Sequence, residues 1–195
     1  NLALFDTKYT DLVVGTIEPN VGLINTNAGT ERVTGLEAEL TWRASDILTI
    51  YASGALLDPR WTELSAGALS TGVKMSDAPP LSYEKQGSAG FSVSTPVGGN
   101  VRMDFNASVN YIGEQYQNVA HLNSPTVLDP ARTTADTSLQ FSSGQHSLTL
   151  AVKNLTDNTD QVVASDFSTF LYNNTTAWTP AEPRTWELRY RYDLK

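Results

Sequence analysis

The sequence contains no cysteine and only two histidines among its 195 residues. The lack of cysteine excludes a disulfide framework, a thiolate metal site and a cysteine nucleophile. No apolar run approaches the roughly 18–20 residues of a transmembrane helix, which excludes a helical membrane protein. The chain has few cationic residues: it contains 13 Lys and Arg and 21 Asp and Glu, which gives a formal net charge of −8. A nucleic-acid-binding protein would show a basic face, so the composition argues against that class.

The clearest pattern that is present lies in residues 101–111, VRMDFNASVNY. Apolar side chains occupy every second position from Val101 to Tyr111, and polar or charged side chains such as Asn106 occupy the positions between. A period of two predicts a β-strand with one apolar and one polar face. The run is about twice as long as a typical strand of a soluble protein. It matches the roughly 9–11 residues with which a tilted strand crosses a bilayer.

Similar alternation along the chain predicts about eight strands. We expect them at residues 2–14, 27–42, 47–57, 83–94, 101–111, 133–141, 146–153 and 184–194. The first is the least regular, because Leu2 and Leu4 share the parity of Asp6 rather than that of Phe5.

The connections between these strands alternate in length. Short connections fall at residues 43–46, 96–99 and 142–145, and long ones at 58–80, 113–130 and 154–183. Outer-membrane barrels have short periplasmic turns and long extracellular loops. The sequence therefore predicts an all-β fold, an antiparallel up-and-down meander that forms part of a transmembrane β-barrel. The alternative, a soluble β-sandwich, also has alternating strands, but it explains neither their length nor the order of the connections.

The two predicted faces differ in charge and in aromatic content. Within the alternating residues of strands two to eight, the apolar positions carry no charge, as expected where an Arg or Lys at mid-bilayer costs about 2–4 kcal/mol. We expect the charged residues of the other face to line a lumen, where they form salt bridges and hold water: Glu37, Glu39, Arg102, Asp104, Glu187, Arg189 and Arg191. Aromatic residues near predicted strand ends are typical of interface girdles: Trp42, Phe91, Tyr111, Phe141 and Tyr192.

No motif for catalysis or metal binding is evident. His121 and His146 have no second histidine or carboxylate at metal-ligand spacing, and the chain has no nucleophile elbow, phosphate loop or EF-hand loop. We therefore predict no catalytic residue, no metal, no cofactor and no enzymatic activity. The long connections carry aromatic and amide side chains that suit stacking and hydrogen bonding to a ligand, or equally loop packing. The tentative ligand-binding residues are Tyr116, His121, Tyr172 and Trp178.

Five segments, taken in order, resemble the C-terminal part of the barrel of TonB-dependent receptors. They are NLALFDTKYTDLVV at 1–14, NAG at 27–29 with GLEAE at 35–39, DAP at 77–79, AVKNLTDN at 151–158 and PRTWELRYRY at 183–192. Two departures stand out. Thr156 occupies a position where the family usually has Phe, and the chain ends on Lys195 where the family ends on an aromatic residue.

The resemblance implies a location and a role. We expect residues 1–195 to be the C-terminal segment of an outer-membrane barrel of about 22 strands, with the plug domain and TonB box upstream of Asn1. The whole protein would take up a scarce nutrient, most often a ferric siderophore, with energy from TonB. The implied partners are outer-membrane lipid, TonB, the extracellular ligand and the barrel assembly machinery. The alternative is a small structural or passive outer-membrane barrel of eight strands.

Overall fold

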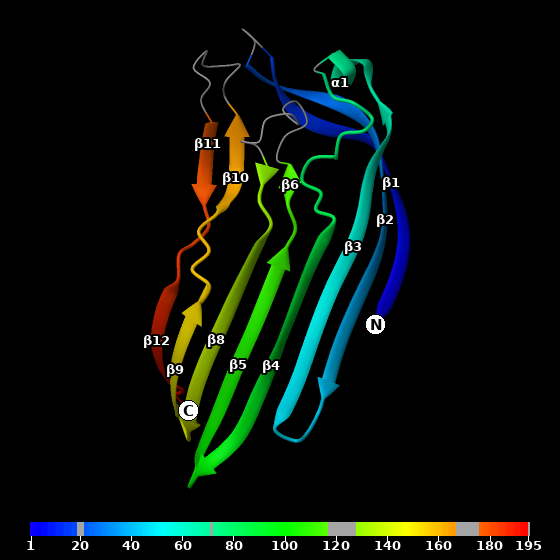
Figure 1. The fold of residues 1–195 in the computed structure, drawn as a ribbon. Helices are drawn as coiled ribbons and strands as arrows, with labels where there is room; N and C mark the ends of the chain where they lie inside the picture. The colour runs from blue at the N-terminus through cyan, green and yellow to red at the C-terminus, as the bar shows by residue number, and fades with distance from the viewer. Residues whose placement is uncertain (19–21, 71, 117–127, 167–175, 195) are drawn as a thin grey trace.

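Eight strands form one antiparallel sheet in a computed structural model that describes residues 1–18, 22–70, 72–116, 128–166 and 176–194. Figure 1 shows them side by side in the order β1-β2-β3-β4-β5-β8-β9-β12. Their bounds are β1 Leu2–Glu18, β2 Gly22–Arg43, β3 Leu48–Leu64, β4 Lys85–Gly98, β5 Val101–Ile112, β8 Arg132–Ser143, β9 His146–Lys153 and β12 Thr185–Tyr192. The predicted meander is confirmed.

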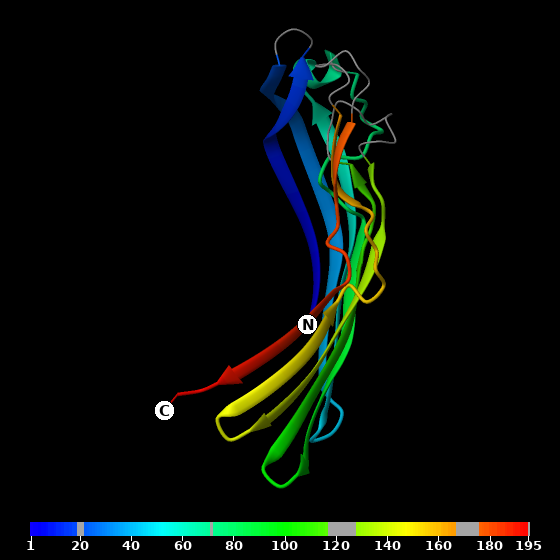
Figure 2. The same cartoon turned by 90° about the vertical axis from the view of Figure 1, so that its left-hand side faces the viewer.

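The sheet is open, because β1 and β12 form its two edges. The chain ends lie on opposite sides of the sheet in Figure 1, and Figure 2 shows how the layer bows along its length. An unpaired strand edge exposes backbone N–H and C=O groups that can pair with another strand. Both edges are therefore places where further strands can be added.

Several strands are longer than predicted. β3 continues to Leu64, through residues 58–64 that were predicted to be a connection, because these residues pair with 29–34 of β2. Likewise, β1 extends to Glu18 and β2 already begins at Gly22. β4 ends at Gly98 rather than at residue 94. Pairing with a long neighbour outweighs the weak strand propensity of Pro59 and the charged residues around it.

The long connections gather at one end of the sheet and the short turns at the other (Figure 1). The long connections contain further elements that the alternation of the sequence does not predict: helix α1 (Ala66–Ser70), β6 (Gln115–Tyr116) paired with β7 (Leu128–Asp129), and β10 (Gln161–Asp166) paired with β11 (Thr176–Pro180). None of the helices in the described residues is long and apolar enough to cross a membrane.

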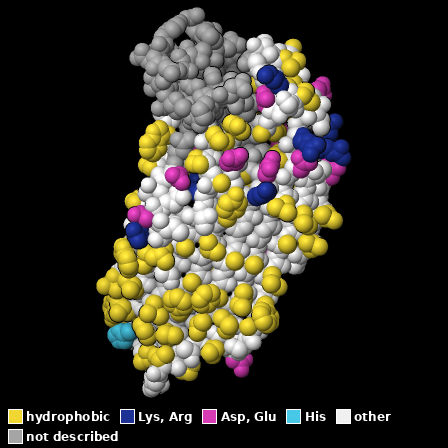
Figure 3. All heavy atoms as spheres, viewed as in Figure 1, with side chains coloured by type: hydrophobic (Ala, Val, Ile, Leu, Met, Phe, Trp, Pro, Cys, Tyr) yellow, Lys and Arg dark blue, Asp and Glu magenta, His cyan; other side chains and the backbone are white. Residues whose placement is uncertain are grey.

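The apolar positions of neighbouring strands lie opposite one another. One row runs across six strands through Leu48, Val93, Phe105, Leu139, Leu150 and Leu188. Large apolar side chains on this face remain exposed, including Trp42 at 56% and Leu188 at 71%. Figure 3 shows them as a band over the lower half of the sheet. We call this surface the apolar band; it is the face that lipid would cover.

The height of the apolar band suits a bilayer. On β3 it runs from Leu48 to Leu56, which is about 26 Å along the strand at roughly 3.3 Å per residue. A tilt of about 35–45° reduces this to roughly 20 Å across the membrane, close to the roughly 25 Å band of known outer-membrane barrels.

The structure corrects two expectations about this face. Above the apolar band the same face does carry charge, because the register continues to Arg32 on β2 and to Asp58 and Arg60 on β3. Phe91 does not belong to a strand-end girdle, because β4 extends to Gly98 and leaves Phe91 in mid-strand, where its ring lies 5.8 Å from that of Phe105.

Candidate functional site

The polar face of the sheet carries the charged side chains predicted to face a lumen. The register of β2, β5 and β12 places all of them opposite the apolar band: Glu37, Glu39, Arg102, Asp104, Glu187, Arg189 and Arg191. Alternation along each strand brings them onto one surface because successive side chains point to opposite faces. Their orientation toward the lumen of a closed barrel stays a prediction.

Ion pairs on this polar face form within single strands or at strand ends. Arg102 Nε lies 3.1 Å from Asp104 Oδ1, Arg191 Nη2 lies 2.7 Å from Asp193 Oδ1, and Arg189 pairs with Glu187. The three guanidinium groups remain open to solvent, since the arginine side chains are 64–70% exposed. Exposed pairs of this kind contribute little to stability. Their effect is to orient charge and to keep the face wet.

A groove of about 650 Å³ lies over the polar face of β1 to β5. Its polar lining comes from Glu37, Glu39, Ser53, Gln86, Ser88 and Asn110. The Ser53 and Ser88 hydroxyls lie 2.8 Å apart, and Asn1 Nδ2 donates to Glu39 Oε2 at 3.2 Å. Carboxylates, hydroxyls and amides together offer many hydrogen bonds to water or to a polar solute.

A small apolar core stabilises the end of the sheet that carries the long connections. Ala28, Trp61, Ala68 and Val73 are buried there, and Leu12, Val14 and Leu64 pack against them. The Ser65 hydroxyl accepts the backbone N–H of Ala68, a contact that fixes the start of α1. Pro79, from the segment 77–79, is fully buried. The connection after β3 is therefore a packed element of this end of the sheet.

Asn154 organises the connection after β9. Its side chain is 7% exposed, and its backbone has a φ of 49°. The Asn154 amide nitrogen donates to the carbonyl oxygens of Asn158 and Glu182, each at 2.8 Å. Its backbone N–H donates to Asp136 Oδ1 at 2.8 Å. Asparagine tolerates a positive φ better than most residues. Through its backbone and side chain together, this one residue joins β8, β9 and the segment before β12.

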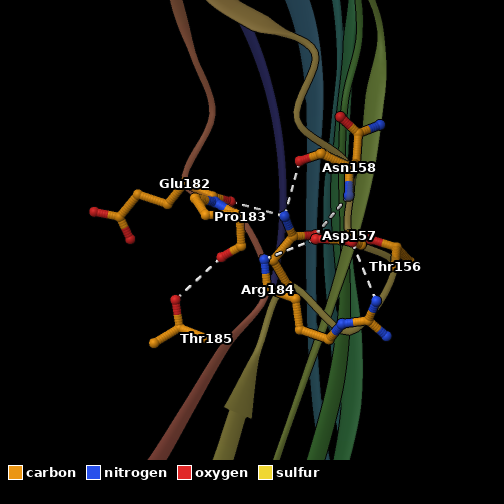
Figure 4. Close-up of polar contacts among 8 residues, drawn as sticks. Thr156, Asp157, Asn158, Glu182, Pro183, Arg184 and Thr185 are labelled. Carbon is orange, nitrogen blue, oxygen red and sulfur yellow. Dashed lines mark hydrogen bonds and ion pairs between the residues drawn. The ribbon is translucent and has the colours of Figure 1, made fainter.

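Asp157 and Arg184 close the same connection (Figure 4). The Arg184 backbone N–H donates to Asp157 Oδ1 at 2.9 Å, and Arg184 Nη2 donates to Asp157 Oδ2 at 3.1 Å. That backbone hydrogen bond is the largest effect on the pKa of the Asp157 carboxyl and lowers it. Burial opposes it, and the charge of the Arg184 guanidinium and its hydrogen bond lower the pKa further. The carboxylate therefore stays ionised while it anchors the start of β12.

The sequence model of the family described as "TonB dependent receptor-like, beta-barrel" matches residues 1–155. The chain belongs to the TonB-dependent receptor family. As a TonB-dependent receptor barrel it is a protein of the Gram-negative outer membrane, which agrees with the apolar band. A comparison with curated proteins gives no match.

Solved structures share the fold of this TonB-dependent receptor segment. The ferric yersiniabactin uptake receptor of Yersinia pestis is 17% identical, with a TM-score of 0.78 over 100% of this chain and 27% of its own. The ferric preacinetobactin receptor of Acinetobacter baumannii is 19% identical, with a TM-score of 0.68 over 99% of this chain and 27% of its own. The ferric-catecholate import receptor of E. coli K12 is 18% identical, with a TM-score of 0.69 over 98% of this chain and 24% of its own. The chain thus spans about a quarter of each.

Two of the four tentative ligand-binding residues lie within the described residues of the receptor segment. Tyr116 is half-buried in β6, and its carbonyl oxygen accepts the Leu81 N–H at 2.7 Å. Trp178 lies in β11, opposite Ala164, and its side chain is 58% exposed. The β6–β7 and β10–β11 hairpins meet where β7 lies against β10. His121 and Tyr172 fall outside the described residues, and ligand contact by any of the four stays a prediction.

The residues that hold the end of the sheet together, and the charges above the apolar band, are not predictable from local sequence. Asn154 lies in the segment 151–158, but its partners Asp136 and Glu182 are distant in sequence. No local pattern predicts the face on which Arg32 and Arg60 lie, because that face is set by the register of β2 with β3. The described residues contain no group of three or more His, Asp or Glu side chains placed to hold a metal ion.

Proposed function

We propose that this chain is the C-terminal wall of a larger receptor barrel and that the whole protein takes up a scarce nutrient with energy from TonB. The observation that carries the proposal is the open eight-stranded sheet, with unpaired edges at β1 and β12, in a chain that the family model matches over residues 1–155. The earlier strands, the plug and the TonB box belong upstream of Asn1 in this proposal. A barrel of eight strands closed by itself would pair β1 with β12, which is not the arrangement of this sheet.

The nutrient we propose is a ferric siderophore. Support comes from the similar structures, which include receptors for ferric yersiniabactin, ferric preacinetobactin and ferric catecholates. In this proposal the chain supplies barrel wall and part of the external mouth, carries out no covalent chemistry, and is inserted by the barrel assembly machinery.

Uptake of radioactive iron by cells that make the full-length protein tests this function. Cells would be given iron chelated by catecholate, hydroxamate or mixed-ligand siderophores, with and without a functional TonB. We expect accumulation of at least one chelate, and we expect it to stop when TonB is removed. Accumulation that continues without TonB would support a passive barrel instead.

A second measurement tests the external mouth. Trp178→Ala is expected to weaken binding of the transported chelate to the purified full-length protein by about threefold to tenfold, because a stacked aromatic contact contributes about 0.5–1.5 kcal/mol. Trp186→Ala is the matched control, since Trp186 is a similarly exposed tryptophan on the apolar band. If the two variants bound the chelate with equal affinity, Trp178 would not contact the ligand at the external mouth.

A further inference from the structure

Glu31 is a buried carboxylic side chain on the polar face of the sheet. It shares that face with Glu37 and Glu39, because the register of β2 with β3 is continuous from Glu31 to Arg43. Glu31 is only 6% exposed, whereas the two lower glutamates are exposed. It lies above Leu36, the last leucine of the apolar band on β2, by about 16 Å of strand at roughly 3.3 Å per residue. Glu31 is therefore outside the membrane-spanning part of the strand.

Residues 72–84, which we call the cover segment, pack onto this part of the polar face. Figure 1 shows them between α1 and β4. Val73 is buried in the small apolar core with Trp61, a side chain of the polar face. The Leu81 N–H donates to the Tyr116 carbonyl oxygen at 2.7 Å. The cover segment is thus held at several points along its length.

The Ser82 hydroxyl joins the cover segment to β2. Ser82 Oγ lies 3.2 Å from Glu31 Oε1 and 3.3 Å from the Pro80 carbonyl oxygen. A hydroxyl has one hydrogen, so it can donate to only one of these acceptors at a time. A protonated Glu31 can donate to Ser82 Oγ while the Ser82 hydroxyl donates to Pro80, and every group then has a partner. An ionised Glu31 competes with the Pro80 carbonyl for the same hydrogen.

No other donor reaches the Glu31 carboxyl among the described residues. Trp61 lies opposite Glu31 in the register, yet its buried indole N–H has no acceptor in the described part of the chain. Burial raises the pKa of the Glu31 carboxyl, and the hydrogen bond from Ser82 lowers it by less. A carboxylate that is buried with one donor is less favourable than its neutral form.

Neighbouring charges do not compensate for this burial. Lys8, Arg32 and Arg60 lie on the opposite face, where the two arginines pair with Asp6 and Asp58. Within the described residues, the other titratable groups on the elements packed here form neither an ion pair nor a hydrogen bond with the Glu31 side chain: Tyr9 on β1, Glu63 on β3, Tyr116 on β6, and Lys74, Asp77, Tyr83 and Glu84 on the cover segment.

We propose that Glu31 is a pH-sensitive latch, whose protonated carboxyl holds the cover segment on the polar face and whose ionisation loosens it. The buried carboxyl binds its proton more tightly than an exposed one. The closed arrangement is therefore most stable below the ordinary pKa of a glutamate, and it loses stability as the pH rises through the higher pKa of the closed structure. Loosening of the cover segment uncovers this end of the polar face. The latch depends neither on the transported nutrient nor on TonB.

Hydrogen exchange in the cover segment of the full-length protein, purified in a neutral detergent, tests the proposal. Peptides that contain residues 72–84 would be followed by mass spectrometry from about pH 4 to about pH 8, a range that includes ordinary and raised glutamate pKa values. All rates would be corrected for intrinsic exchange. Glu31→Gln replaces the carboxyl by a neutral amide of similar size. Glu63→Gln is the matched control, because Glu63 is an exposed carboxylate in the next residue pair of β2 and β3.

We expect the corrected exchange of the parent to increase at least about fivefold over this range, because a buried charge that lacks donors costs at least as much as an unmade hydrogen bond. Glu31→Gln cannot ionise, so its exchange should stay slow at every pH, and Glu63→Gln should follow the parent. A parent rate that does not change with pH, or the same pH dependence in Glu31→Gln as in the parent, would overturn the proposal.

Ser82→Ala keeps the test decisive if Glu31→Gln fails to assemble. This change removes the hydrogen bond that lowers the pKa of Glu31. We therefore expect the exchange of the cover segment to rise more steeply with pH than in the parent. An equal or smaller rise would exclude the contact between Ser82 and Glu31 as the latch.

Discussion

On the apolar face, Leu188 is 71% exposed and Leu150 is 45% exposed, and no element among the described residues covers them. On the polar face of the same strands, Arg189 is 65% exposed and is paired with Glu187. Side chains on both faces are thus exposed, but only the charged ones are compatible with water. A hollow of about 800 Å³ on the apolar side is lined by residues such as Leu48, Ile50 and Phe91, whereas the 650 Å³ groove holds carboxylates and amides.

The apolar face therefore determines the environment in which the sheet is stable. Exposed apolar area costs about 25 cal/mol per Å² in water and nothing comparable in lipid, whereas exposed ion pairs contribute at most about 1 kcal/mol each. The apolar band therefore fixes the location in the membrane, and the polar face leaves room for functional variation. Substitutions on opposite faces should differ accordingly.

The largest expected effect is that of Phe105→Arg on assembly. Phe105 lies in the middle of β5, between Val93 and Leu139. Arginine at mid-bilayer costs about 2–4 kcal/mol, so we expect most of the full-length variant to be lost from the outer membrane. Electrophoresis of unheated membrane samples, in which folded barrels migrate apart from unfolded chains, measures the folded fraction.

Asn106→Arg is the control for that measurement, because Asn106 is the next residue and lies on the polar face opposite Ser138. We expect a folded fraction close to that of the parent. If the two arginines reduced the folded fraction equally, Phe105 would not face lipid and the distinction between the faces would be lost.

A smaller effect is expected from Gly90→Ala. A Cβ at Gly90 would lie 2.5 Å from the ring of Tyr51 and 2.5 Å from the Ala107 carbonyl oxygen. Overpacking of this kind typically costs about 1–3 kcal/mol, because the backbone of β5 has to move. Gly54→Ala is the matched change on the apolar face, where the nearest atom would lie at an ordinary 3.4 Å. The midpoint of urea unfolding in detergent should fall for the first variant only.

Alternation along each strand was sufficient to predict the strands and their faces, because lipid on one side and water on the other impose a period of two. The extension of β3 through residues 58–64 was not predictable, since Asp58 and Pro59 resemble a loop until they pair with β2. The face of Arg32 and Arg60 depends on the same pairing. Local sequence predicts strand propensity, but it does not predict where the neighbouring strand ends.

The residues that hold the long connections show the same limit. The segment AVKNLTDN was recognisable by resemblance, yet the role of Asn154 follows from partners that lie 18 and 28 residues away. Tyr116 and Trp178 were chosen for their chemistry, and the structure adds that their hairpins meet at β7 and β10. Long-range hydrogen bonds of this kind have no signature in composition or periodicity.

Tyr190→Phe should have a modest effect at the short-turn edge of the apolar band. The Tyr190 hydroxyl lies 2.7 Å from His146 Nδ1, and a net hydrogen bond contributes about 0.5–1.5 kcal/mol. We expect thermal unfolding of the full-length protein to shift down slightly. Tyr111→Phe, whose hydroxyl makes no hydrogen bond within the described residues, should leave the unfolding temperature unchanged. If both variants lowered the unfolding temperature equally, the effect would come from loss of a hydroxyl at the membrane interface and not from the hydrogen bond to His146.

The smallest expected effect concerns Asp157, which lies outside both faces and whose carboxyl pKa is lowered by the Arg184 backbone N–H and guanidinium. A carboxyl with a lowered folded pKa stabilises the structure above about pH 4, and its contribution is lost as the pH falls through the folded value. We expect hydrogen exchange at the Arg184 amide to be slower in the parent than in Asp157→Asn at neutral pH. The two rates, corrected for intrinsic exchange, should converge in acid. A constant ratio at every pH would mean that the oxygen atoms of residue 157, rather than the charge of its carboxylate, anchor the start of β12.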